Sequence, residues 1–198
     1  MEAQRQRRIR ITLNAPVVLA FVALCTAATL LGQLTGGRAT MTLFATYRSS
    51  LLNPLTYVRL LTHVLGHSGW PHLVGNMVYV LLLGPLLEEK YGSRALVGII
   101  AATAITTGLV NAVLFPRVAL CGASDVCFAF ILLSSLTSFS EGEIPLTFIL
   151  VALLFLGQEV FQGVMVQDDV SNLSHVIGGL VGACMGFAQR DLGRHRHA

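Results

Sequence analysis

Charged residues are scarce in this chain, and their scarcity argues against an ordinary soluble fold. Only 12% of the 198 residues are Asp, Glu, Lys or Arg, whereas 54% are hydrophobic. Soluble domains typically carry about 25% charged residues. The composition therefore predicts an integral membrane protein. The net charge is +3, without a basic stretch interleaved with aromatic residues, so no nucleic-acid partner is expected.

Cysteine is also sparse and shows no metal-binding pattern. The four cysteines are Cys25, Cys121, Cys127 and Cys184, and no two of them have CxxC spacing. All four fall inside long apolar segments, so we interpret them as small packing residues rather than disulfide partners or metal ligands. The sequence contains no internal repeat and no low-complexity linker, which indicates a single domain.

Six apolar windows of about twenty residues predict six membrane-spanning helices. The predicted spans are 15–34, 72–87, 95–114, 118–139, 144–164 and 171–189. The second span has a short apolar core and the sixth is rich in small residues, so counts of five and seven stay open. The first apolar run is longer than the core of a signal peptide, which favours a retained helix.

The expected fold class is an all-α membrane protein built as a bundle of six transmembrane helices. The membrane domain is predicted to cover residues 15–189. A basic N-terminal segment, 1–14, precedes it, and a basic tail, 190–198, follows it.

The distribution of Lys and Arg predicts how the bundle is oriented. With six spans, nine basic residues share one side of the membrane: Arg5, Arg7, Arg8, Arg10, Lys90, Arg94, Arg190, Arg194 and Arg196. Four fall on the other side: Arg38, Arg48, Arg59 and Arg117. The positive-inside rule therefore places both termini in the cytoplasm. The short length, the minimal loops and an N-terminus unlike a transit peptide favour the plasma membrane of a bacterium.

Residues 35–71, between the first and second spans, are too numerous and too apolar for an ordinary connection. Leu43, Phe44 and Leu60 are among the apolar side chains that would be unfavourable in water. We expect this stretch to form short helices that lie half-sunk in the outer leaflet. The pair Asn53-Pro54 is typical of a turn followed by the start of a helix.

Two polar residues near the outer ends of predicted spans are candidate catalytic groups. Ser124 lies in LCGASDVCF and His175 in SNLSHVIGG, at matching depths in two helices that enter from the outer face. An imidazole at this level can make a serine hydroxyl nucleophilic. Gly122 would let the backbone turn tightly and expose that hydroxyl near a helix N-terminus. The alternative is a serine that only bonds the carbonyl of the preceding turn.

Two pairs of polar residues with helical spacing suggest further chemistry. His72 and Asn76 lie four apart on the second span and could donate hydrogen bonds to an oxyanion, or could simply bond neighbouring helices together. His63 and His67 have the same spacing and, with His72, suggest a zinc site. No Cys, Asp or Glu nearby completes such a site, so structural hydrogen bonding is the preferred interpretation.

Taken together, these motifs resemble the rhomboid family of intramembrane serine proteases. The match runs roughly from Arg59 to Gly186 and includes HxxxN in the second span, GxS in the fourth, and His followed by GxxxG in the sixth. The segments VRLLTH and LEEKYGS match as well. The resemblance implies a six-helix rhomboid-like fold that cleaves single-span or membrane-anchored protein substrates near the outer face of the lipid bilayer. It implies no cofactor and no metal.

The resemblance also implies a role for each matching residue. Ser124 corresponds to the nucleophile, His175 to the general base, and His72 and Asn76 to the oxyanion donors. Supporting positions are Gly122, Phe128, which would pack the catalytic imidazole, Gly178, which would let the fourth and sixth helices approach closely, and Arg59 and Glu88, which would form structural hydrogen bonds.

Asp125 departs from the GxSG pattern of the family, in which a glycine follows the serine. Its carboxylate could crowd the contact between the fourth and sixth helices, or water in an open cavity near the outer interface could solvate it. The alternative function is therefore a catalytically inactive rhomboid-like pseudoprotease that binds client transmembrane helices. A transporter is disfavoured because the sequence shows no paired discontinuous helices.

Overall fold

The structure is a computed structural model that describes residues 13–138 and, further on, residues 146, 149, 150, 153, 154 and 157. The six later residues are helical and fall in the predicted fifth span, 144–164. The predicted sixth span, 171–189, lies outside the described residues, and so do both basic terminal segments except Leu13 and Asn14.

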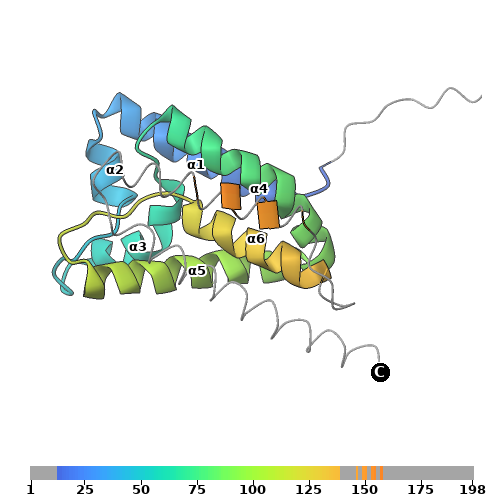
Figure 1. Ribbon diagram of the computed structural model, residues 1–198. Helices are drawn as coiled ribbons and strands as arrows, with labels where there is room; N and C mark the ends of the chain where they lie inside the picture. Colours follow the sequence, from blue (N-terminus) through green and yellow to red (C-terminus); the bar gives the residue numbers. More distant parts are fainter. Residues whose placement is uncertain (1–12, 139–145, 147–148, 151–152, 155–156, 158–198) are drawn as a thin grey trace, which may run out of the picture.

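All the regular elements in the described part of the chain are helices, and it forms no β-strand beyond the isolated bridge between Thr46 and Leu120. Its elements are α1 (Pro16–Leu34), α2 (Arg38–Leu43), α3 (Pro54–Thr62), the short 3-10 helix η1 (His63–Leu65), α4 (Trp70–Tyr91), α5 (Ser93–Leu114) and α6 (Ser124–Ser138). Figure 1 shows α6 between α4 and α5, with α2 and α3 gathered at one end of the bundle. The short turn between α4 and α5, at Gly92, makes these two helices antiparallel.

Among the described residues, three helices are long and apolar enough to cross a membrane. They are α1, α4 and α5, and α5, with 22 residues, rises about 33 Å, close to the ~30 Å thickness of a bilayer's hydrocarbon core. They correspond to the first three predicted spans. The second is longer at both ends than predicted, from Trp70 to Tyr91 rather than 72–87.

The prediction for the fourth span was wrong at its start. It placed a helix from residue 118, whereas α6 begins at Ser124. Leu120 instead pairs with Thr46 through two backbone hydrogen bonds of 2.9 Å, and Gly122 has a φ of +135°. Both features are incompatible with a continuing helix. Cys121 therefore precedes the helix, although the sequence placed it inside a span.

The starts of α1 and α3 illustrate two ways of satisfying the free N–H groups of a first turn. In α3, the Asn53 side chain accepts a hydrogen bond from Leu55 N–H at 3.0 Å and Pro54 follows, which confirms the predicted helix start. In α1 no side chain of its own caps the helix. The carboxylate of Glu88, on α4, accepts instead from the N–H groups of Val17 and Val18, both at 3.0 Å.

Apolar side chains fill the space between the helices and also cover much of the outside. Val18, Val80, Leu96 and Phe130 are among the buried residues from α1, α4, α5 and α6. Large exposed apolar residues follow the outer face of α4: Val74, Val78, Leu81, Leu82 and Leu86. A helix with five large exposed apolar side chains on one face suits an environment of lipid.

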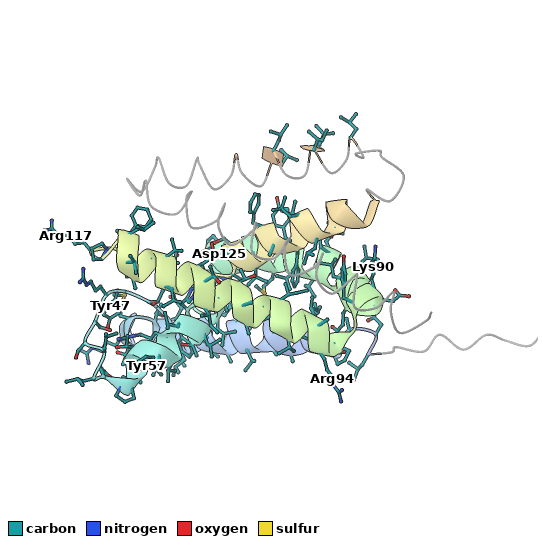
Figure 2. The ribbon with its side chains drawn as sticks, turned by 90° about the horizontal axis from the view of Figure 1, so that it is seen from below. Tyr47, Tyr57, Lys90, Arg94, Arg117 and Asp125 are labelled. Carbon is teal, nitrogen blue, oxygen red and sulfur yellow. The ribbon has the colours of Figure 1, made fainter. Side chains whose placement is uncertain are left out.

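Charged and aromatic side chains mark the two ends of the bundle. Figure 2 shows Lys90 and Arg94 at one end and Tyr47, Tyr57 and Arg117 at the other. Because Glu88 caps α1, this helix begins at the end that carries Lys90 and Arg94. The short helices α2 and α3 precede α4 at the opposite end, in the stretch where the sequence predicted them. Their position in the outer leaflet stays a prediction.

Candidate active site

Ser124 is the first residue of α6, directly after a sharp change of backbone direction. Gly122 adopts a φ of +135°, which side chains other than glycine rarely allow. Its N–H donates a 3.0 Å hydrogen bond to the backbone carbonyl of His63, in η1. The loop before α4 therefore holds the segment that leads into Ser124, whose side chain is almost fully buried at 4% exposure.

His72 reaches the same place from the first turn of α4. A Cβ atom built on Gly122 would lie 2.8 Å from His72 Nε2 and 3.7 Å from Ser124 Oγ. Both functional atoms therefore surround the Cα of Gly122, and only a glycine leaves room for the imidazole. Ser68 Oγ lies 3.1 Å from the other ring nitrogen, Nδ1. When Ser68 donates this bond, the imidazole hydrogen sits on Nε2, the atom that faces Gly122.

Asn76 lies one turn further along α4 and faces α6. It is buried, at 3% exposure. The Cys127 thiol lies 3.4 Å from the Asn76 backbone oxygen and 3.9 Å from Oδ1. The amide nitrogen Nδ2 is buried and has no hydrogen-bond partner among the described residues. Within the described part of the chain, Asn76 therefore has an unpaired donor, which is unusual for a buried amide.

The remaining predicted site residues are placed only in part. Phe128 is buried in the core, at 7% exposure, one turn after Ser124. His175 and Gly178 lie outside the described residues, and so does the predicted contact between the fourth and sixth helices. The structure therefore brings together Gly122, Ser124 and His72, and places Asn76 one turn further along α4, against Cys127. The general base stays a prediction from the sequence.

His63 and His67 form hydrogen bonds with backbone carbonyls, as the structural interpretation expected. His63 Nε2 lies 2.9 Å from the Ala104 oxygen and His67 Nδ1 lies 3.1 Å from the Leu65 oxygen. Burial, together with the charge of His72, lowers the pKa of His67 to about 3. Burial also lowers the pKa of His63. The part of the chain that the structure describes contains no group of three His, Cys, Asp or Glu residues able to hold a metal.

Asp125 is buried, so the idea that an open cavity solvates it was wrong. Its exposure is 1%, and Figure 2 shows it inside the bundle. Its charge acts on His63, whose pKa it raises against the larger effect of burial. The prediction of a solvated Asp125 failed for a physical reason. The helix α6 begins later than predicted, so Asp125 lies in its first turn, and η1 packs against α6.

Two residues outside the site, Glu88 and Arg59, form hydrogen bonds that hold helices and loops in place around it. Glu88 joins α4 to the first turn of α1 and also accepts a 2.7 Å hydrogen bond from Ser93 Oγ. Arg59 donates to Tyr47 Oη and Ser49 Oγ, both at 2.7 Å. Both are structural hydrogen-bonding positions, as expected.

Two residues of the site were missed or misread from the sequence. Cys127 was interpreted as packing alone, yet its thiol touches Asn76. Ser68 was not considered, although it lies four residues before His72 and contacts its ring. The i, i+4 spacing of Ser68 and His72 was the available signal, but Ser68 precedes the helix, where such spacing carries no fixed meaning.

Chemically, these residues provide a hydroxyl at a helix N-terminus and an imidazole nitrogen that both lie beside Gly122, and an amide on the next turn of α4 that has no partner among the described residues. This combination suits the stabilisation of an oxyanion that forms beside Ser124. The arrangement requires a glycine at position 122, because a residue with a Cβ would be strained at a φ of +135° and would collide with His72.

Comparisons with known proteins agree with this geometry. The family model described as Rhomboid domain matches residues 54–191. The chain is also 27% identical over 137 residues to Rhomboid-like protein 11, chloroplastic, of Arabidopsis thaliana, which amounts to 60% of this chain and 48% of that protein. It thus spans about half the length of that relative. Because the domain model matches well over half of its residues, the chain belongs to the rhomboid family.

Proposed function

We propose that this chain is an intramembrane serine endopeptidase that cleaves membrane-anchored proteins near the outer face of the bilayer. The observation that carries the proposal is that Ser124 Oγ and the His72 imidazole both lie beside Gly122, directly before the start of α6. Membership of the rhomboid family supports the same reaction class.

The proposed mechanism is acyl transfer by a pair formed by Ser124 and His175. Ser124 Oγ attacks the carbonyl carbon of the scissile bond while His175 accepts the hydroxyl proton. The carbonyl oxygen becomes an oxyanion, to which His72 Nε2 and Asn76 Nδ2 donate hydrogen bonds. Collapse of this intermediate breaks the C–N bond, and His175 returns the proton to the leaving amine. Water then attacks the acyl group in the same way and restores the serine.

The proposed fold is a bundle of six helices over residues 15–189, with both termini in the cytoplasm of a bacterial cell. The start of α1 lies at the end that carries Lys90 and Arg94, and the sequence before α1 is basic, which supports this orientation. The relative from Arabidopsis carries the word chloroplastic in its name, which describes that protein. The plasma membrane is our proposal for this one.

The second candidate function is a rhomboid-like pseudoprotease that binds client transmembrane helices without cleaving them. Asp125 favours this alternative, since it replaces a glycine of the family pattern and places a carboxylate next to Ser124 in a buried position. A charge there opposes the formation of a second negative charge on the oxyanion.

A serine-reactive fluorophosphonate distinguishes the two candidates. We expect the purified chain to be labelled and the Ser124→Ala variant to stay unlabelled. The control variant Ser50→Ala changes an exposed serine in the loop before α3 and should be labelled like the wild type. Co-expression with a panel of single-span reporters then tests cleavage against the same Ser124→Ala control. A folded wild type that resists the probe and captures reporters intact would support the pseudoprotease.

A further inference from the structure

Arg59 is a buried cation without a counter-ion. Its side chain is 3% exposed, and within the described residues no carboxylate oxygen lies within ion-pair distance of it. Its only polar partners there are the hydroxyls of Tyr47 and Ser49, and its carbon Cζ lies 4.3 Å above the centre of the Tyr47 ring. The nitrogen Nε has no hydrogen-bond partner in this part of the chain. Because a buried charge is stabilised by an opposite charge nearby, this region would favour an anion.

A pocket of about 440 Å³ lies between the segment that follows α2, α3 and the end of α5, and two of its lining residues accept hydrogen bonds from Arg59. Tyr47 and Ser49, the two hydroxyls that Arg59 holds, belong to its wall, and the exposed Arg48 is a third polar member. Leu60, Leu109 and Val113 form much of its apolar side. Among the described residues, no Asp or Glu lines the pocket. Its potential is therefore positive on one side, and its surface is apolar on the other.

Among the described residues, the hydroxyl hydrogen of Tyr47 is left without an acceptor in the wall of the pocket. Thr56 Oγ1 donates to the Ser50 carbonyl at 2.7 Å, so in its 2.8 Å contact with Ser49 the serine must donate. The Ser49 hydrogen is thus occupied. Tyr47 accepts from Arg59, and its own hydroxyl hydrogen has no acceptor among the described residues. A hydroxyl that already accepts from a cation is a stronger donor, which suits an anionic ligand.

The place of the pocket indicates what kind of anion fits. Figure 2 shows Tyr47, Tyr57 and Arg117 at the same end of the bundle, and tyrosine and arginine are typical of the level of lipid headgroups. Leu109 and Val113 are 48% and 70% exposed on the last turns of α5, so they continue the apolar side toward the lipid. A free phosphate would make no contact with the apolar side of the pocket. An amphiphile with an anionic head and an acyl chain satisfies both halves.

We propose that this pocket binds an anionic phospholipid, whose headgroup phosphate accepts hydrogen bonds from Tyr47 and Arg48 and whose acyl chain lies along Leu109 and Val113. Arg59 acts on the phosphate through the Tyr47 hydroxyl, to which it donates a hydrogen bond, and the bound lipid ties α3 to α5. Because both elements hold the loop that contacts Gly122, the lipid composition affects the stability of this region.

The test uses the full chain, purified in detergent and placed in nanodiscs of phosphatidylcholine with or without phosphatidylglycerol. Native mass spectrometry of the released protein measures how much phosphatidylglycerol stays bound. We expect the wild type to retain it in preference to phosphatidylcholine. The double variant Tyr47→Phe/Arg48→Gln should retain about tenfold less, since it lacks two charge-assisted donors but keeps the aromatic ring over Arg59.

Arg117→Gln is the matched control, because it removes a cation at the same end of the bundle that does not line the pocket. It should retain as much phosphatidylglycerol as the wild type. Equal retention by the double variant, or an equal loss in Arg117→Gln, would overturn the proposal. The proposal would also be overturned if glycerol phosphate alone displaced the lipid. The same holds if an acidic peptide displaced it and a second anionic lipid did not.

Discussion

Asn76 offers a prediction in which stability and activity change in opposite directions. Its Nδ2 is buried with no hydrogen-bond partner in the described part of the chain. A buried polar group left without a partner costs about 1–3 kcal/mol. Leucine has nearly the shape of asparagine and no polar atom. Asn76→Leu should therefore stabilise the protein by about 1 kcal/mol or more.

The same change should damage catalysis. Removing one oxyanion donor typically lowers kcat about 10²–10³-fold, or roughly 3–4 kcal/mol of transition-state stabilisation. Because the hydrogen bond forms mainly in the transition state, KM should change little. The surroundings of Cys127 should also change little, since its thiol keeps its closer neighbour, the Asn76 backbone oxygen at 3.4 Å.

Two measurements check this prediction. Cleavage of a single-span reporter in liposomes gives kcat and KM, and thermal unfolding in detergent gives the change in stability. Met77→Leu, a volume-conserving change at the next, buried residue of α4, is the control and should alter both quantities only slightly. If Asn76→Leu lowers the stability, the amide forms structural hydrogen bonds. If KM rises while kcat stays constant, Asn76 binds substrate, and the role of oxyanion donor is wrong.

Three further changes test the frame and the buried charges. Glu88→Gln should lower the stability by about 1–3 kcal/mol, because an amide replaces the charged acceptor of two α1 N–H groups, and thermal unfolding measures this. Stability should fall as the pH drops from 6.5 toward about 3, since the folded chain holds His67 neutral while the unfolded chain protonates it; His67→Gln should flatten this slope in a series of Tm values. Asp125→Asn should raise Tm by removing a buried charge, and Asp125→Gly should change kcat/KM less than tenfold. A large loss of cleavage in both Asp125 variants would show that the carboxylate takes part in catalysis.

Hydropathy and local signals predicted the helices whose ends depend on their own residues. The apolar windows located α1, α4 and α5. Asn53-Pro54 located the start of α3, because a side chain that caps and a proline that fixes φ act within one turn. The four-residue spacing of His72 and Asn76 likewise predicted that both would face the same region, since they share a regular helix.

The start of α6 could not be predicted in this way. Residues 118–123 are apolar, and hydropathy cannot distinguish an apolar helix from an apolar extended segment. What decides is the pairing of Leu120 with Thr46, which is remote in the sequence, and the support of Asn111, whose Nδ2 donates to both the Thr46 and Val118 carbonyls. The late start of α6 also places Asp125 in the first turn of the helix, close to His63 of η1, and this contact between remote segments was not predictable from the sequence either.

The loop before α4 helps to position the residues of the proposed site, because it forms hydrogen bonds with the segment that leads into Ser124. Gly122 can hold its left-handed backbone because the His63 carbonyl binds its N–H, and His63 is itself fixed by the Ala104 carbonyl of α5. Ser124 thus takes its position from η1 and α5 as well as from α6. An imidazole on α4 and a hydroxyl on α6 then meet at a point that neither helix determines alone. It follows that changes in η1 or at Thr46 should impair the site without touching any group that reacts.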